Sequence, residues 1–206
     1  MKVDQIVVSQ QRVANIIAWI QRFENYDELA VTLDEVLSRL EFSVKADRFE
    51  HAFDELGRAL GFSTQRPDKE WKEGPDNLWA LRDGEYLLVE CKSEVHLDRS
   101  EIAKDETGQM NNACAWFAKN YKGAKAKNII IIPRTKLANG AGFNEEVQVM
   151  RKTELNKLTK NIRSFFAEFA SADFKDLSEK KVQALLDTHH LSVEVILNEY
   201  SKPPRT

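Results

Sequence analysis

Cysteine is scarce in this chain: two residues in 206, and their spacing suits neither a disulfide framework nor a zinc site. Both Cys91 and Cys114 sit inside apolar stretches. A run of 18 apolar residues is also missing, which argues against a transmembrane helix, and the N-terminus has no signal-peptide core. These absences predict a reduced, cytoplasmic protein that does not associate with membranes.

Two common catalytic arrangements are missing as well. Gly140-Ala141-Gly142 is not followed by Lys-Ser/Thr and opens no evident helix, so it does not resemble the phosphate loop of an ATPase. The four histidines form no Ser/His/Asp or metal-ligand pattern. The chemistry of the chain must be sought in its carboxylates and lysines.

The chain does have enough apolar residues, 42% of the total, to bury one solid core. Hydrophobic periodicity predicts an α/β fold of helices and strands. The expected helices cover 5–40 (broken near 25–27), 46–60, 103–121 and the segment from 153, and Ser178 and Ser192 cap two short final helices. The expected strands cover 62–65, 76–81, 85–92, 128–132 and 147–150. We expect a helical appendage or linker over 1–44, the core over 45–170, and a helical extension with a disordered tail over 171–206.

Two charged residues end an apolar strand in an unusual way. The run 86–89 is followed by Glu90-Cys91-Lys92, and residues two apart in a strand point to the same face. Burying an unpaired charge costs several kcal/mol, so these side chains need partners. A divalent metal with a bound phosphate would provide them: Glu90 and Asp76 would hold the metal, and Lys92 would face the anion.

This interpretation depends on the hairpin between the two strands. Arg82-Asp83-Gly84 is typical of a turn. A three-residue loop with Gly84 in the left-handed region would pair Leu81 with Glu85 and Asp76 with Glu90, side by side on one face. A two-residue loop would pair Asp76 with Cys91 and separate the carboxylates.

Pro75-Asp76, a spacer with a turn, and Glu90-x-Lys92 together resemble the motif of the PD-(D/E)xK nuclease superfamily. The resemblance implies the restriction-endonuclease-like fold, a central mixed sheet flanked by helices. The context extends the resemblance from about Phe49 to Ile132. Upstream, a Phe49-Glu50 pair opens a helix that ends at a Gly-aromatic step into a strand. Downstream, Gln109 falls in the helix after the motif, where several branches of the family place a glutamine.

The resemblance implies metal-assisted hydrolysis of phosphodiester bonds. Asp76, Glu90 and the backbone carbonyl of Cys91 would coordinate Mg²⁺, for which Mn²⁺ can substitute. Lys92 would orient the attacking water and stabilise the charge that develops on the phosphate. Glu50 would hold a metal-bound water or a second metal. Gln109 is the least specific of these assignments, because the tyrosine that some branches place one turn later is Ala113 here.

A basic segment follows the motif. The net charge of the chain is −3, yet residues 119–163 carry eleven basic and three acidic residues. Such local patches bind phosphate backbones. The residues predicted to contact nucleic acid are Lys119, Lys122, Lys125, Lys127, Arg134 and Lys136.

Simpler explanations exist for each feature taken alone. Asp76 after Pro75 fits a turn, Glu90 with Lys92 fits an exposed ion pair, and the basic segment fits solvated helix and loop faces. Taken together, the features favour a metal-dependent deoxyribonuclease, with DNA a more natural substrate than RNA, from a restriction, phage-defence or repair system. The alternative is a silent nuclease-fold module that binds nucleic acid or docks onto a partner such as a helicase. A homodimer is compatible with either function.

Overall fold

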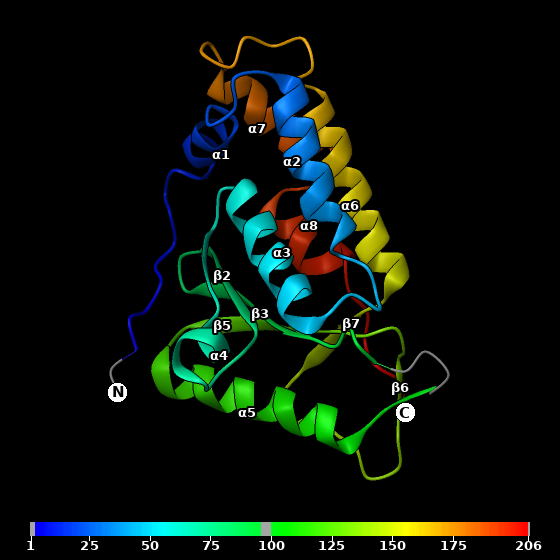
Figure 1. Ribbon diagram of the computed structural model, residues 1–206. Coiled ribbons are helices and arrows are strands. Elements are labelled where there is room, and N and C mark those ends of the chain that lie inside the picture. The colour runs from blue at the N-terminus through cyan, green and yellow to red at the C-terminus, as the bar shows by residue number, and fades with distance from the viewer. Residues whose placement is uncertain (1–2, 96–99, 206) are drawn as a thin grey trace.

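The computed structural model describes residues 3–95 and 100–205 and has a mixed α/β architecture. A five-stranded sheet in the order β1-β2-β3-β5-β7 lies between two layers of helices (Figure 1). The strands are β1 (Ser63–Gln65), β2 (Asn77–Arg82), β3 (Glu85–Cys91), β5 (Lys125–Ile131) and β7 (Val147–Met150). Strands β1, β2 and β3 pair antiparallel, whereas β3, β5 and β7 are parallel.

The alternation of side chains along the strands gives each face of the sheet its own core. Leu87, Val89 and Cys91 face one cluster, and Tyr86 and Leu88 face the other. The second face is covered by α5 (Lys104–Asn120), which lies below the sheet in Figure 1. The first face is covered by α3 (Ala46–Ala59) and α6 (Lys152–Ala167). Side chains that share the face of Leu88, along β3 and just beyond its end, therefore point toward α5.

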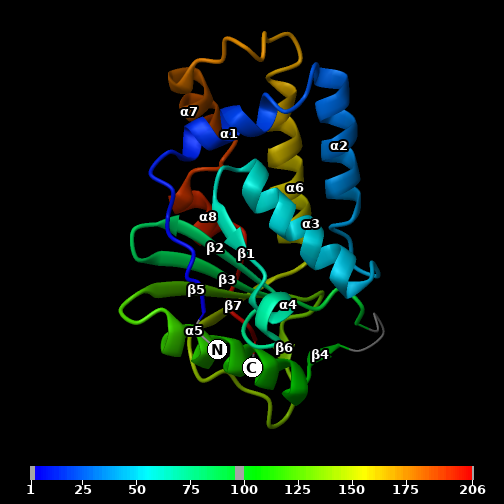
Figure 2. The ribbon, with the colours of Figure 1, turned by 60° about the vertical axis from the view of Figure 1, so that its left-hand side comes forward.

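The N-terminal helices belong to this core. Helices α1 (Arg12–Ile20) and α2 (Tyr26–Ser38) bury Trp19 and Leu29 in the same cluster as α3 and α6. Asn25 caps α2 through the amide of Glu28, as its place between the two predicted helices suggests. The expected appendage over 1–44 is thus packed into the main core, as Figure 2 also shows. The predicted helix begins too early, because residues 3–9 are not helical.

The C-terminal region also packs against the core. Helices α7 (Glu179–Thr188) and α8 (Val193–Glu199) are capped by Ser178 and Ser192, as predicted. The expected disordered tail is wrong for residues 201–205. The backbone of Lys202 exchanges two hydrogen bonds with Val149 of β7, at 2.7 and 2.9 Å, and Arg205 bonds to Thr135 and Leu137. These bonds satisfy backbone groups at the edge of the sheet, which would otherwise be unpaired.

Three short elements lie outside the predicted set. A single-turn helix, α4 (Pro67–Trp71), occupies the charged connection after β1. Strands β4 (Glu101–Ile102) and β6 (Lys136–Leu137) form a separate two-stranded ribbon. In the part of the chain that the structure describes, no helix is long and apolar enough to cross a membrane.

Candidate active site

The hairpin places the two carboxylates of the motif side by side. Asn77 pairs with Val89, and one further step along the ladder puts Asp76 opposite Glu90, which is the predicted register. The turn differs from the prediction: Glu85 pairs with Arg82 instead of Leu81, and a register shift between Ala80 and Arg82 absorbs the extra residue. Gly84 takes the left-handed conformation, with φ of 69°. The register shift at the bulge therefore places Asp76 opposite Glu90, which a regular two-residue loop would not do.

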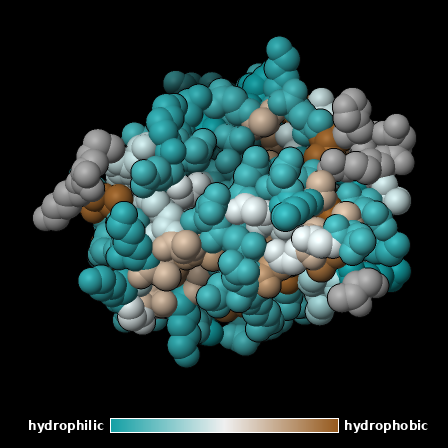
Figure 3. Space-filling model, turned by 90° about the horizontal axis from the view of Figure 1, so that it is seen from below, coloured by the Kyte–Doolittle hydropathy of each residue, from teal (hydrophilic) through white to brown (hydrophobic). Residues whose placement is uncertain are grey.

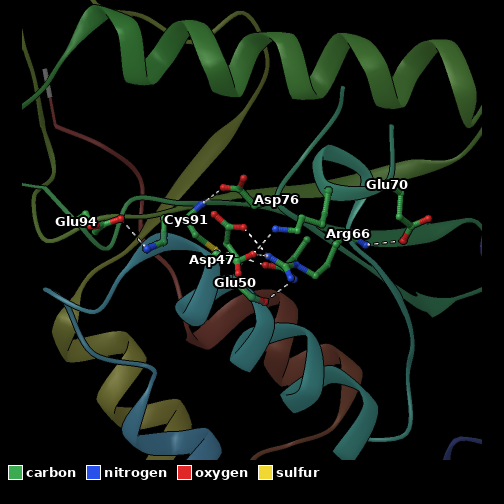
Figure 4. Close-up of polar contacts among 10 residues, drawn as sticks. Asp47, Glu50, Arg66, Glu70, Asp76, Cys91 and Glu94 are labelled. Carbon is green, nitrogen blue, oxygen red and sulfur yellow. Dashed lines mark hydrogen bonds and ion pairs between the residues drawn. The ribbon is translucent and has the colours of Figure 1, made fainter. Parts of the chain in front are cut away.

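Burial raises the pKa of both carboxyl groups. Glu90 is 4% exposed, and its pKa is raised by burial, with Lys92 offsetting part of the shift. Burial and the neighbouring charge of Glu90 raise the pKa of Asp76 to about 7. Asp76 Oδ2 accepts a 2.7 Å hydrogen bond from the Cys91 amide, and this bond orients the carboxylate (Figure 4). Two neighbouring carboxyl groups with raised pKa values are typical of a functional site.

Lys92 lies on the same face as Glu90, as the spacing predicted. Its Nζ donates a 3.1 Å hydrogen bond to Glu90 Oε2, and its side chain is only 16% exposed. Burial alone would lower the pKa of Lys92, but the charges of Glu90 and Asp76 outweigh it and raise the pKa. Lys92 is therefore a fixed cation, and the interpretation as an ion pair on an exposed face does not fit these side chains.

One cavity of about 590 Å³ brings the predicted residues together. Asp76, Glu90 and Lys92 line the cavity on the side of the sheet, and Gln109 lines the cavity on the side of α5. Gln109 is thus in position to contact a ligand, although its assignment from sequence was the least specific. A cavity of this size suits a small-molecule-sized group.

Glu50 is near the site but has a different partner. It lies on α3, beyond the opposite face of the sheet, and it is absent from the cavity wall. Its carboxylate binds Arg66 at 2.7 Å, and Arg66 also binds Asp47 at 3.1 Å (Figure 4). Burial and the charge of Asp76 raise the pKa of Glu50. Its predicted role as a ligand is therefore replaced, in this conformation, by an ion pair.

The remaining neighbours of the motif have structural contacts. The Cys91 side chain is buried, with Sγ 3.6 Å from Asn77 Oδ1, while its carbonyl remains a predicted ligand. Glu94 Oε2 accepts a 2.8 Å hydrogen bond from the Ala46 amide at the start of α3. Among the described residues, no three His, Cys, Asp or Glu side chains form a metal-binding group.

The basic segment does not converge on the carboxylates. Lys125 pairs with Glu85 at the hairpin end of β3, five residues or roughly 16 Å from Glu90. Lys122 and Lys127 lie at that same end, and Lys136 binds Glu101 at 2.7 Å in the small ribbon. Arg134 is 5% exposed, so its assignment to an exposed phosphate-binding surface is wrong. Lys119 is the member of the predicted set that lines the cavity.

The sequence did not predict the residues that form the opposite wall of the cavity. Asp68, Lys72 and Glu73, from α4 and the loop after it, line the cavity, and the charge of Asp68 acts on both Asp76 and Glu90. The Asp68 amide donates a 3.1 Å hydrogen bond to the Pro75 carbonyl, so the wall is tied to the start of β2. Pro67 at the first position of α4 is the sequence signal that marks this turn of helix.

The raised pKa of Asp76 predicts an unusual dependence of stability on pH. The folded protein binds a proton that the unfolded chain has lost, so in the absence of metal the free energy of unfolding falls as pH rises from about 4 to about 7. The Asp76→Asn variant should be more stable than the parent at pH 8 and should show a weaker fall over that range. Urea unfolding in EDTA at several pH values measures this. Equal slopes for the two proteins would contradict it.

No protein-family model, curated protein or solved structure matches this chain. The function is therefore argued from the geometry of the site.

Proposed function

We propose that this protein is a metal-dependent nuclease that hydrolyses phosphodiester bonds in DNA on a restriction-endonuclease-like fold. The observation that carries the proposal is the meeting of Asp76, Glu90 and Lys92 in one cavity, with the two carboxylates paired across a hairpin. The order of elements agrees with the resemblance: a helix, a short strand, the hairpin, a crossover helix and a parallel central strand.

The donor set fits Mg²⁺. This ion prefers hard oxygen ligands and is commonly held by one or two carboxylates plus water and substrate phosphates, without a complete protein cage. Asp76 and Glu90 provide two such carboxylates, and the Cys91 carbonyl is a third candidate oxygen. Burial raises the pKa of both acids, and a bound cation would balance their charges and favour the ionised form. When bound, the metal would activate a water molecule and polarise the scissile phosphate.

The residues of the chain have separate tasks in this reaction. Asp76 is oriented by the Cys91 amide, and Glu90 is oriented by Lys92 Nζ. Lys92 stays protonated and supplies positive charge where negative charge develops on the phosphate. Gln109 extends from α5 into the same cavity and can hydrogen-bond the substrate or the attacking water.

The direct test is a cleavage assay. Purified protein is incubated with supercoiled plasmid and with single-stranded DNA in Mg²⁺ or Mn²⁺, beside Asp76→Asn and Glu90→Gln. These variants keep the shape of each side chain but remove its charge, so we expect the parent to cut and both variants to lose at least roughly 10²-fold in rate. Circular dichroism of all three proteins checks that the fold is retained.

Metal-binding calorimetry on the same proteins distinguishes the proposal from its alternative. A nuclease should bind Mg²⁺ or Mn²⁺ through the two carboxylates, and the substitutions should weaken that binding. DNA binding without metal binding or turnover would instead favour a silent nuclease-fold module. Cleavage that persists in both variants would place the active site elsewhere.

A further inference from the structure

The cavity beside the carboxylates has two walls that come from distant parts of the chain. One face of α5 forms the first wall, and the segment from Asp68 to Gly74 forms the second. Residues Gln109, Asn112, Trp116 and Lys119 recur at helical spacing along α5, so the cavity follows the helix for ten residues, or about 15 Å. The site is therefore an elongated space with Asp76 and Glu90 on its side.

The two walls are packed against each other next to this space. Trp71 stacks on Trp116 with ring centroids 6.0 Å apart. Gly74 has φ of 96° and lies so close to α5 that an added Cβ would be 2.7 Å from the Trp116 ring. These contacts hold the second wall on α5, so the carboxylates lie between two walls and not on an open surface.

A free lysine stands on each wall. Lys72 ends α4 in the left-handed conformation, with φ of 60°, and Lys119 lies in the last turn of α5. Both side chains are exposed, and within residues 3–95 and 100–205 neither makes a hydrogen bond or an ion pair. Lys69 and Lys136, in contrast, bind Asp47 and Glu101. Unpaired lysines that line a cavity are available for an anionic ligand.

We propose that the cavity takes a single-stranded segment of nucleic acid, with Lys72 and Lys119 binding a backbone phosphate next to the one held at Asp76 and Glu90. The proposal rests on the proposed function and names its substrate class. Lys119 lies roughly 15 Å along α5 from Gln109, so we assign it to another phosphate of the strand and not to the scissile one.

The size of the cavity favours one strand over two. About 590 Å³ accommodates a nucleotide-sized group, whereas a base pair with both backbones attached is much wider. A single strand is flexible and can lie along α5 in the cavity beside the contact between Trp71 and Trp116. The surface around α5 is mainly hydrophilic, with small apolar areas between polar side chains (Figure 3), which suits a polar ligand such as a nucleic-acid strand.

The net charge of the residues that line the cavity affects the binding of a phosphate. Asp68, Glu73, Asp76 and Glu90 outnumber Lys72, Lys92 and Lys119 among its lining residues. Without a divalent cation this balance repels phosphate, and with one the balance becomes positive. Binding of the strand should therefore depend on metal.

Fluorescence anisotropy tests the proposal by binding alone. A short labelled oligonucleotide and its blunt duplex are titrated with the parent, Lys72→Gln, Lys119→Gln and Lys180→Gln, in Ca²⁺ and in EDTA. We expect the parent in Ca²⁺ to bind the single strand at least about tenfold more tightly than the duplex. Removal of Lys72 or Lys119 should reduce the slope of log affinity against log salt by about 0.7 each. Lys180→Gln, an exposed position on α7 at the opposite end of the molecule from α5 (Figure 1), is the matched control and should leave the slope unchanged.

The outcomes separate this proposal from the proposed function. Equal or tighter binding of the duplex, no binding of either DNA, or an equal effect of Lys180→Gln would overturn the single-strand proposal, even if plasmid is cut. Metal-dependent binding of single strands with no cleavage of any DNA would keep the ligand assignment and remove the nuclease activity.

Discussion

Replacing Lys92 with methionine is expected to reduce the rate of phosphodiester cleavage by roughly 10²–10³-fold, the usual effect of removing one positioned electrostatic group. Methionine keeps the length of the side chain but removes the ammonium group that lies 3.1 Å from Glu90 Oε2. The fold should survive, because Glu90 can take up a proton when its partner is lost. The measurement is the single-turnover rate in saturating Mg²⁺, with urea unfolding of the same samples.

Lys69→Met is the control for this prediction. Lys69 lies on α4 near the site and binds Asp47 at 2.8 Å, but it does not line the cavity. Its removal should change the rate less than about twofold, within the range of a surface substitution. Full activity in Lys92→Met, or an equal loss in Lys69→Met, would refute the assigned role of Lys92.

Trp19→Ala is expected to lower the free energy of unfolding by about 3–5 kcal/mol, the typical effect of removing a large buried aromatic side chain. Trp19 is 6% exposed and packs against Phe166 of α6, with ring centroids 5.1 Å apart. Because α1 shares its core with α6, the whole protein should lose stability in one cooperative transition. Guanidinium unfolding followed by fluorescence and by circular dichroism measures both the midpoint and the cooperativity.

Val31→Ala on α2 serves as the comparison. Val31 is 61% exposed, so its truncation should change stability by less than about 0.5 kcal/mol. If Trp19→Ala leaves the main transition in place and only produces an early minor one, the N-terminal helices form a separate unit. That result would restore the appendage predicted from sequence.

Local patterns predicted the part of the site that depends on short-range geometry. The period of two along a strand put Glu90 and Lys92 on one face. Asp76 lies opposite Glu90 as predicted, although a bulge between Ala80 and Arg82 provides the register in place of the predicted three-residue loop. Each of these rules involves residues joined by one hairpin. The α/β class and most elements were predicted for the same reason, since periodicity and capping act over a few turns or residues.

Contacts between distant segments were not predictable in this way. Glu50 lies beside the apolar stripe of Phe49 on its helix, but nothing in the pattern indicates that Arg66, 16 residues later, binds its carboxylate. The basic segment was read as one patch, whereas α5 carries Lys119 to the cavity and β5 starts with Lys125 at the other end of the sheet. Charge counted along the chain cannot show which residues face the same space.

The amphipathic faces of the N-terminal helices were recognised, but not their partners. Leu29 and Trp19 fit a helix that covers any apolar surface, and only tertiary packing selects α3 and α6 as that surface. The single-turn α4 was missed because its charged sequence lacks a hydrophobic period.

The contact between α1 and the loop that joins α7 to α8 bears on the order in which the chain folds during synthesis. Arg12 of α1 donates hydrogen bonds to the carbonyls of Leu60, 48 residues later, and of Leu191, 179 residues later. Helix α1 therefore emerges from the ribosome long before its final neighbours exist. Until residues near 191 have been translated, the apolar face of α1 is a natural target for chaperones, and closure of the core is a late, long-range event of the kind that slows folding.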